Sequence, residues 1–193
     1  MAGRGIVVIG ASAGGVQVLE NIVGGLASDL PAAVFVVLHT WIKWPSVLPA
    51  ILARSGPLSA EHARHVAAIR RGMIYVAPPD CDLPVERGVM RLDCKASQRK
   101  HRPSIDILFQ SAARAYNAGV VGVLLSGSDN DGSAGMLEIY QSGGATIVQD
   151  PLDSQFTQMP RSAIRNGSAG HILKIANISG CIGQLVLGGE AAA

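Results

Sequence analysis

Three kinds of side chain in this sequence could together perform nucleophilic acyl transfer: a serine hydroxyl, a histidine imidazole and an aspartate carboxylate. The candidates are Ser12, His39 and either Asp129 or Asp131. Serine is a poor nucleophile near neutral pH, so it needs an adjacent base to take its proton. The base in turn needs a carboxylate that holds its tautomer and stabilises the imidazolium. The spacing along the chain leaves the choice between the two aspartates open.

Ser12 lies in a turn of small residues with the sequence GASAGG, residues 10–15. Such a turn leaves the hydroxyl exposed and lets a substrate carbonyl approach the backbone. The amide of Ala13, at the start of the expected helix, is a candidate oxyanion donor and is aided by the helix dipole. Simpler interpretations stay open, because a serine in such a turn often caps a helix or binds phosphate. A lone histidine at a strand end is often structural, and aspartates in polar loops often form turns.

Each candidate comes after an apolar run that is typical of a buried strand. Ser12 follows residues 6–9, and His39 follows residues 33–38. The two aspartates follow residues 120–125. In open parallel sheets, ligands bind outside the carboxyl ends of the strands. We therefore expect the three side chains to converge at one edge of a sheet.

Strands and helices alternate along the rest of the chain, which predicts an α/β fold. Strands are expected over 6–9, 33–38, 73–77, 120–125 and 145–149, and helices over 16–26, 46–54, 104–116 and 160–166. Residues 83–86 and 89–93, joined by Arg87-Gly88, predict an antiparallel hairpin. We expect one domain over residues 1–193: a doubly wound, mainly parallel sheet with helices on both faces and an appended hairpin.

A dinucleotide-binding unit also begins with a strand, a glycine-rich turn and a helix. Here, however, Gly10 is followed by Gly14 and Gly15, which is not the G-x-G-x-x-G spacing. The second expected strand ends at His39 without the acidic residue that would bind a ribose. Both features disfavour this alternative.

Composition sets further limits on the class of protein. The formal net charge of +2 over 193 residues is too small to indicate nucleic-acid binding. No apolar run approaches the length of a membrane span, which predicts a soluble protein without membrane insertion. Cys81, Cys94 and Cys181 form no CxxC pair and no metal-like spacing, so we expect three thiols, no metal and a reducing cytoplasm.

Six groups of residues spread over nearly the whole chain carry a family resemblance. They are VIGASAGG (8–15), LH (38–39), IYVAPP (74–79), HRPSIDILF (101–109), LSG with DG (125–127 and 131–132), and QDP with MPRSAI (149–151 and 159–164). In this order they resemble the catalytic domain of the chemotaxis methylesterase family CheB. The resemblance implies hydrolysis of glutamyl methyl esters on chemoreceptor helices, with glutamine deamidation as a further activity. It implies Ser12 as nucleophile, His39 as base and Asp131 as orienting acid, and no cofactor.

Two residues depart from the family pattern beside the acid. Ser128 and Asp129 stand where the family usually has Met-Gly, and that methionine lies near the reacting centre in relatives. Ser128 is therefore expected at the oxyanion or substrate site, together with Met159. If Asp129 faces His39, it raises the pKa of the imidazole and shifts the activity optimum upward. The same departures support an alternative, a catalytically altered CheB-like domain that serves as a protein-binding module.

Basic residues bear on the partner. Residues 99–102 form the cluster Arg-Lys-His-Arg, and Arg161 and Arg165 lie four residues apart on an expected helix. They form either a solvated basic face or a groove, including Arg102, that attracts the acidic helices of a methyl-accepting chemotaxis receptor or a related methylated protein. The family's receiver domain is not found before the catalytic part, so we expect either a stand-alone variant, which the initial Met favours, or a fragment of a longer protein. His62, His65 and His171 are expected to be surface or structural residues away from the strand edge.

Overall fold

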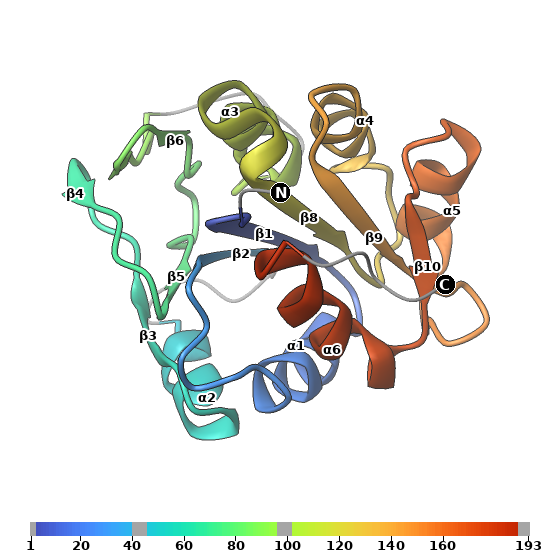
Figure 1. Ribbon diagram of the computed structural model, residues 1–193, viewed down its shortest axis with the longest axis horizontal. Coiled ribbons are helices and arrows are strands. Elements are labelled where there is room, and N and C mark those ends of the chain that lie inside the picture. Colours follow the sequence, from blue (N-terminus) through green and yellow to red (C-terminus); the bar gives the residue numbers. More distant parts are fainter. Residues whose placement is uncertain (1–2, 40–45, 96–101, 189–193) are drawn as a thin grey trace.

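A parallel sheet of seven strands forms the centre of the protein (Figure 1). The computed structural model describes residues 3–39, 46–95 and 102–188. In spatial order the strands are β10 (His171–Leu173), β9 (Ala145–Gln149), β8 (Val120–Leu124), β1 (Ile6–Ala11), β2 (Ala33–Leu38), β5 (Met73–Val76) and β3 (Ser59–His62). Every pairing between neighbours is parallel. The prediction of a mainly parallel α/β sheet is confirmed.

Helices cover both faces of this sheet (Figure 1). One face carries α1 (Gly15–Gly24), α2 (Leu48–Ser55) and α6 (Ile175–Val186), and the other carries α3 (Ile105–Tyr116), α4 (Ser133–Gln141) and α5 (Gln158–Arg165). Among the described residues, no helix combines the length and the hydropathy that a bilayer crossing requires.

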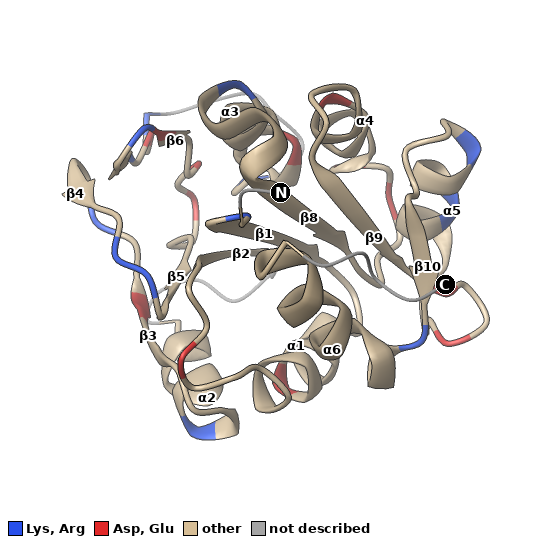
Figure 2. Cartoon of the chain, in the orientation of Figure 1, with Lys and Arg blue, Asp and Glu red and all other residues tan. Residues whose placement is uncertain are grey.

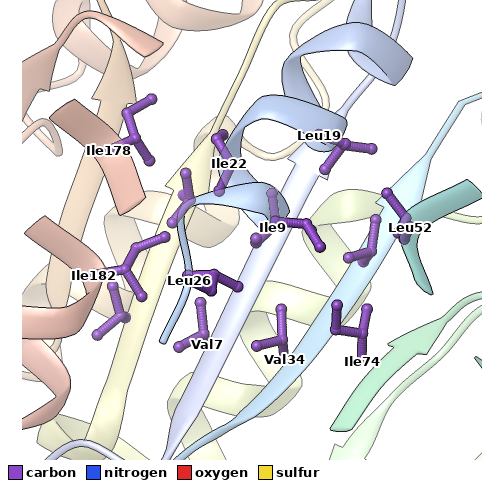
Figure 3. Packing of buried hydrophobic residues seen from close by; sticks show 14 of the residues in the cluster. Val7, Ile9, Leu19, Ile22, Leu26, Val34, Leu52, Ile74, Ile178 and Ile182 are labelled. Carbon is purple, nitrogen blue, oxygen red and sulfur yellow. The ribbon is translucent and has the colours of Figure 1, made fainter. Parts of the chain in front are cut away.

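Burial on both faces explains the continuous apolar strands of the sequence. All six residues of β1 and all six of β2 are buried. On one face, Val7 and Ile9 of β1 pack in the same cluster as Leu19 and Ile22 of α1 and Ile182 of α6 (Figure 3). The rigid core places the ends of β1 and β2 side by side, which matters for the site.

A second, antiparallel sheet of three short strands lies beside the main one. Its order is β4 (Ala67–Ala68), β7 (Val89–Met90) and β6 (Val85–Glu86). The turn between β6 and β7 contains Gly88 at φ 76°, a left-handed conformation that glycine adopts without strain. The predicted hairpin is confirmed, and β4 adds a strand that the sequence pattern did not indicate.

Three elements of the main fold lack a clear sequence signal. β3 has the sequence Ser-Ala-Glu-His and no apolar run, because it is an edge strand that is only half-buried. β10 has three residues, and α6 follows it. The expectation that His62 lies away from the strand edge is wrong, since His62 is the last residue of β3. Its imidazole nitrogens lie 3.4 Å from the carbonyl oxygen of Val76 and 3.2 Å from that of Ser46, which is a structural role.

The expectation of three free thiols is also wrong, because Cys81 and Cys94 form a disulfide. The two residues are 13 apart in sequence, and their Cα atoms are 4.3 Å apart. Asp82 and Asp93, their neighbours, exchange two backbone hydrogen bonds of 3.0 and 2.9 Å. This antiparallel bridge brings the cysteines together, and it continues the register of the predicted hairpin, in which residue 81 lies opposite residue 94. Cys181 is a buried free thiol, and the cysteines therefore do not support a reducing compartment.

Candidate active site

The site lies where three adjacent strands end. Ser12 follows β1, which lies between β2 and β8, and His39 follows β2. The amide of His39 donates to the carbonyl of Ala11 at 3.0 Å, and the amide of Ser12 donates to the carbonyl of Ser126 at 2.9 Å. From β1 the chain continues to β2, which pairs with one edge of β1, and the later strand β8 pairs with the other edge. This is a topological switch point, the usual location of ligand sites in such sheets.

Asp131 is deeply embedded at the N-terminus of α3. Its carboxylate accepts hydrogen bonds from the amides of Ile105 (2.7 Å) and Asp106 (3.0 Å) and from the hydroxyl of Ser104 (3.2 Å). Burial raises the pKa of Asp131, but the hydrogen bonds from His39 and from these two amides outweigh it and hold the pKa below its usual range. Asp131 is therefore a stable anion that can orient a histidine.

His39 lies between two carboxylates. Its Nε2 is 2.9 Å from Oδ2 of Asp131, and its Nδ1 is 3.3 Å from Oδ2 of Asp129. Burial lowers the pKa of His39, but the contacts with Asp129 and Asp131 and their negative charges outweigh it and raise the pKa to about 9. Asp129 therefore faces His39, which is the condition under which the sequence predicts a raised pKa of the imidazole.

Asp106 lies behind Asp131 on the first turn of α3. Its carboxylate accepts a hydrogen bond of 2.7 Å from the amide of Gly135. Burial raises the pKa of Asp106, the Gly135 amide lowers it, and the charge of Asp131 raises it, with a net value of about 6. Asp106 joins α3 to α4, so the position of Asp131 depends on both helices.

Ser12 and His39 open onto the same cavity. This cavity has a volume of about 240 Å³ and is lined by Ser12, Gly14, Gly15, Val16, Gln17, Leu38, His39 and Gln155. Ser12 is half-exposed, which is the exposure that an attacking hydroxyl needs. A ligand in the cavity can contact the hydroxyl and the imidazole at once.

The simpler interpretations of these residues fare differently. The N-cap of α1 is Gly14, at φ 75°, and it has no side-chain capping bond, so Ser12 does not cap the helix. Asp129 does form a turn, because its Oδ1 accepts the amide of Asp131 at 2.9 Å. Turn formation thus applies to Asp129, whereas helix capping does not apply to Ser12.

The four further candidates are placed as follows. Ala13 is half-buried, and its carbonyl accepts a hydrogen bond of 2.9 Å from the hydroxyl of Ser126. Ser128 is exposed at the start of the acid loop. Met159 is fully buried, and a Cβ at Gly127 would lie 1.9 Å from its Sδ and 2.9 Å from Cβ of Ser12. Met159 thus supports the floor of the site beneath Gly127, and glycine there permits the close approach.

The side chain of Arg102 is 11% exposed and contacts the segments around the disulfide. Its guanidinium lies 3.6 Å from a carboxylate oxygen of Asp82 and 3.5 Å from one of Asp93, and it also donates to the carbonyl oxygens of Asp93 and Lys95. Residues 99–101, the rest of the predicted basic cluster, lie outside the described residues. Arg161 and Arg165 are exposed on α5, and Lys and Arg residues are otherwise spread over several elements (Figure 2).

Sequence reasoning missed the groups that support the triad candidates. Ser104 is correctly predicted as the cap of α3, where it accepts from the amide of Ile107 at 3.4 Å, but its bond to Asp131 is not foreseen. Gln149 is fully buried and accepts the amide of Ser126 at 2.9 Å. Both residues lie inside the family motifs, which is the one signal that singles them out. Within residues 3–39, 46–95 and 102–188, no group of three or more His, Cys, Asp or Glu side chains could hold a metal ion.

Comparisons with known proteins identify the family of this chain. The family described as CheB methylesterase matches residues 7–182. A relative from Leptospira interrogans is 33% identical over 175 residues, which are 90% of this chain and 90% of the relative. The protein-glutamate methylesterase/protein-glutamine glutaminase 2 of Anaeromyxobacter dehalogenans is 36% identical over 93% of this chain, which spans 53% of that relative.

A solved structure supports the same assignment. The crystal structure of the Thermotoga maritima CheB methylesterase catalytic domain superimposes with a TM-score of 0.88 and 29% identity, over 96% of this chain and 100% of that one. The chain belongs to the CheB methylesterase family.

Proposed function

We propose that this chain is a protein-glutamate methylesterase with Ser12 as nucleophile, His39 as general base and Asp131 as orienting acid. The observation that carries the proposal is the series of contacts around one imidazole. Nε2 of His39 lies 2.9 Å from the buried carboxylate of Asp131, and His39 shares a cavity with Ser12. The names of relatives such as the Anaeromyxobacter protein support the choice of substrate.

The reaction follows from the roles of the three groups. The Ser12 hydroxyl gives its proton to neutral His39, and its oxygen forms a bond to the ester carbonyl carbon. The tetrahedral intermediate collapses, the carbon–oxygen bond to methoxide breaks, and His39 returns the proton so that methanol leaves. Water, deprotonated by His39, then attacks the acyl carbon, the bond to the Ser12 oxygen breaks, and His39 returns the proton to Ser12 as the glutamate leaves.

Stabilisation of the oxyanion falls to the nucleophile turn. The amide of Ala13 lies just before Gly14, the N-cap of α1, near the end of the helix where the dipole favours negative charge. The carbonyl of Ala13, in the following peptide, accepts a hydrogen bond from the hydroxyl of Ser126, which anchors the turn. We expect the ester carbonyl to enter the cavity beside Gly14, which has no side chain of its own, opposite the side chain of Gln155.

The substrate we propose is the cytoplasmic helical part of a methyl-accepting chemotaxis receptor or a related methylated protein. Residues 1–193 would act as the catalytic domain. Deamidation of glutamine follows the same chemistry with ammonia as the leaving group, and the relatives' names include glutaminase. Release of ammonia from an unmodified receptor domain tests that second activity.

Release of labelled methanol from methylated receptor cytoplasmic domains tests the proposal directly. We expect Ser12→Ala to lower turnover by at least about 10⁴-fold, because the residual rate then comes from binding and the oxyanion site alone. Ser126→Ala and Ser128→Ala serve as serine controls, and we expect each to retain more activity than Ser12→Ala. Ester hydrolysis by Ser12→Ala at the wild-type rate would disprove the nucleophile assignment.

Labelling with a small serine-directed phosphonate separates the enzyme from the alternative, a binding module with altered catalysis. We expect stoichiometric modification at Ser12. Absence of modification at every pH between roughly 6 and 10 would favour the binding module.

A further inference from the structure

The imidazole of His39 has a carboxylate at each of its two ring nitrogens. We propose that Asp129 is a positioning residue that holds the ring nitrogen required by Ser12 and so decides when His39 can act as a base. This inference rests on the proposed function. It concerns regulation of the proposed site by a residue outside the triad.

The geometry leaves only one nitrogen for the nucleophile. Nε2 faces Asp131 at 2.9 Å, so the proton of Ser12 can be accepted only at Nδ1. Oδ2 of Asp129 lies 3.3 Å from that Nδ1. In the serine-protease triad, Nδ1 faces the aspartate and Nε2 faces the serine; here Asp131 holds Nε2 instead, so Nδ1 is the nitrogen left for the serine hydroxyl. Asp129 therefore competes with Ser12 for the same atom.

The loop geometry directs Asp129 at the imidazole. One carboxylate oxygen, Oδ1, accepts the backbone amide of Asp131 at 2.9 Å. The other oxygen, Oδ2, is the one beside His39. The side chain of Asp129 is only 12% exposed. A short turn thus orients two carboxylates, two residues apart, towards opposite sides of one ring.

The charged groups around His39 favour its protonated form. From the loop after β8, Asp129 and Asp131 contact the ring. Behind Asp131, α3 contributes Asp106, and Asp82 accepts the amide of Ser104 at 2.9 Å while pairing with Arg102. Among the described residues, the two direct contacts are anionic, and the one cation in this group is paired with Asp82.

A protonated His39 cannot take a proton from Ser12. The pKa of about 9 that the two carboxylates produce means that about one imidazole in a hundred is neutral at pH 7. The resting enzyme then holds Nδ1–H against Asp129. Loss of this proton to solvent frees the Nδ1 lone pair, and the Ser12 proton can then move to it. Activity should therefore rise with pH up to about 9.

Titration of the His39 ring nitrogens by NMR tests the contact between Asp129 and His39 without relying on activity. Asp129→Asn removes the charge, but its amide oxygen can still accept the Asp131 amide, so the turn is preserved. We expect the pKa of His39 to fall by at least about one unit. The matched control is Asp150→Asn, after β9 at the same edge of the sheet, where the carboxylate accepts the Leu152 amide at 2.9 Å in a similar turn. We expect this control to leave the pKa unchanged.

An unchanged pKa of His39 in Asp129→Asn would overturn the proposal. Asp129→Ser, whose hydroxyl can also accept the turn amide, provides a second variant if the first is unstable. Equal falls in the Asp129 and Asp150 variants would overturn it as well, because they would indicate a general field rather than a contact.

The pH profile of phosphonate labelling at Ser12 then connects the pair to the nucleophile. We expect the rate in wild type to rise to about pH 9, and the profile of Asp129→Asn to shift to lower pH by the same amount as the pKa. If the pH profiles of wild type and Asp129→Asn coincide, the proposal that Asp129 controls His39 is overturned. A wild type that is never labelled, with the pKa shift still present, would instead count against the proposed function alone.

Discussion

The two sides of His39 are built differently although each presents an aspartate. On the Nε2 side, Asp131 is 9% exposed and accepts further hydrogen bonds from the amides of Ile105 and Asp106 and the hydroxyl of Ser104. On the Nδ1 side, Asp129 accepts the backbone amide of Asp131 within its own loop, beside the exposed Ser128. Asp131 is fixed by the N-terminus of α3, a separate element of the fold, which suits a structural acid. Asp129 is oriented by a turn of its own loop, which suits a contact that must be released.

The largest expected difference between the two sides is in turnover. We expect Asp131→Asn to lower kcat by about 10³- to 10⁴-fold, because the amide cannot stabilise the imidazolium and favours the wrong tautomer. Asp129→Asn should change kcat by less than about tenfold at pH 9, where its effect on protonation is small. Steady-state methanol release by both variants at that pH measures the contrast. Equal losses would remove the distinction between the two carboxylates.

The stability of the fold should depend on the charge of His39. Its pKa is raised from 6.5 to about 9, so the stabilisation is fully present below pH 6.5 and is lost as the pH rises through 9. The shift corresponds to roughly 3 kcal/mol in the free energy of unfolding. Urea unfolding at about pH 6 and pH 10 should show this loss in wild type and a smaller one in His39→Asn. A variant with the same pH dependence as wild type would contradict the prediction.

The disulfide supports the Asp131 side through Asp82, which accepts the amide of Ser104. Replacing both cysteines by serine opens a loop of 13 residues and should lower the free energy of unfolding by about 3 kcal/mol. Chemical denaturation measures the loss. The contact of Asp129 with His39 is on the other side of the ring, so the pKa of His39 should stay high in the folded variant. Loss of that raised pKa would show that the two sides are not independent.

The smallest expected effect comes from Ser104→Ala. It removes the cap of α3 and one hydrogen bond to Asp131, which should cost about 1 kcal/mol in stability and reduce turnover a few-fold. Ser111→Ala on the same helix is a matched control, because its hydroxyl accepts the amide of Val85 and donates to the carbonyl of Leu108, both at 2.9 Å. A loss of turnover in the control equal to that in Ser104→Ala would indicate a general effect of destabilising α3.

Local patterns in the sequence predict the centre of the fold better than its edges. The apolar runs predict β2 and β9 to the residue, because strands covered on both faces are mainly apolar. β3 is half-buried and contains Glu61 and His62, so no run marks it. The disulfide depends on the pairing of Asp82 with Asp93, which extends the predicted hairpin in the same register, but the spacing of the cysteines alone does not mark it.

The candidate site divides in the same way. The strand ends and the family motifs predict that Ser12, His39 and Asp131 are neighbours. They do not predict which ring nitrogen faces which carboxylate, because that depends on side-chain rotation within a turn. The sequence does not decide whether Asp129 faces His39. The structure does, because it places Oδ2 of Asp129 3.3 Å from Nδ1 of His39.

Ser126 has a consequence for motion near the nucleophile. Its hydroxyl donates to the carbonyl of Ala13 at 2.9 Å and accepts the amide of Phe156 at 3.0 Å, and its own carbonyl accepts the amide of Ser12. One buried residue thus joins the turn after β1 to the segment that contains Gln155, a wall of the cavity. Neither segment can open by itself without breaking these bonds, so both should exchange their amide hydrogens in a single cooperative fluctuation. Widening of the entrance would then displace the attacking hydroxyl as well, which couples access of a bulky helix to alignment of the nucleophile.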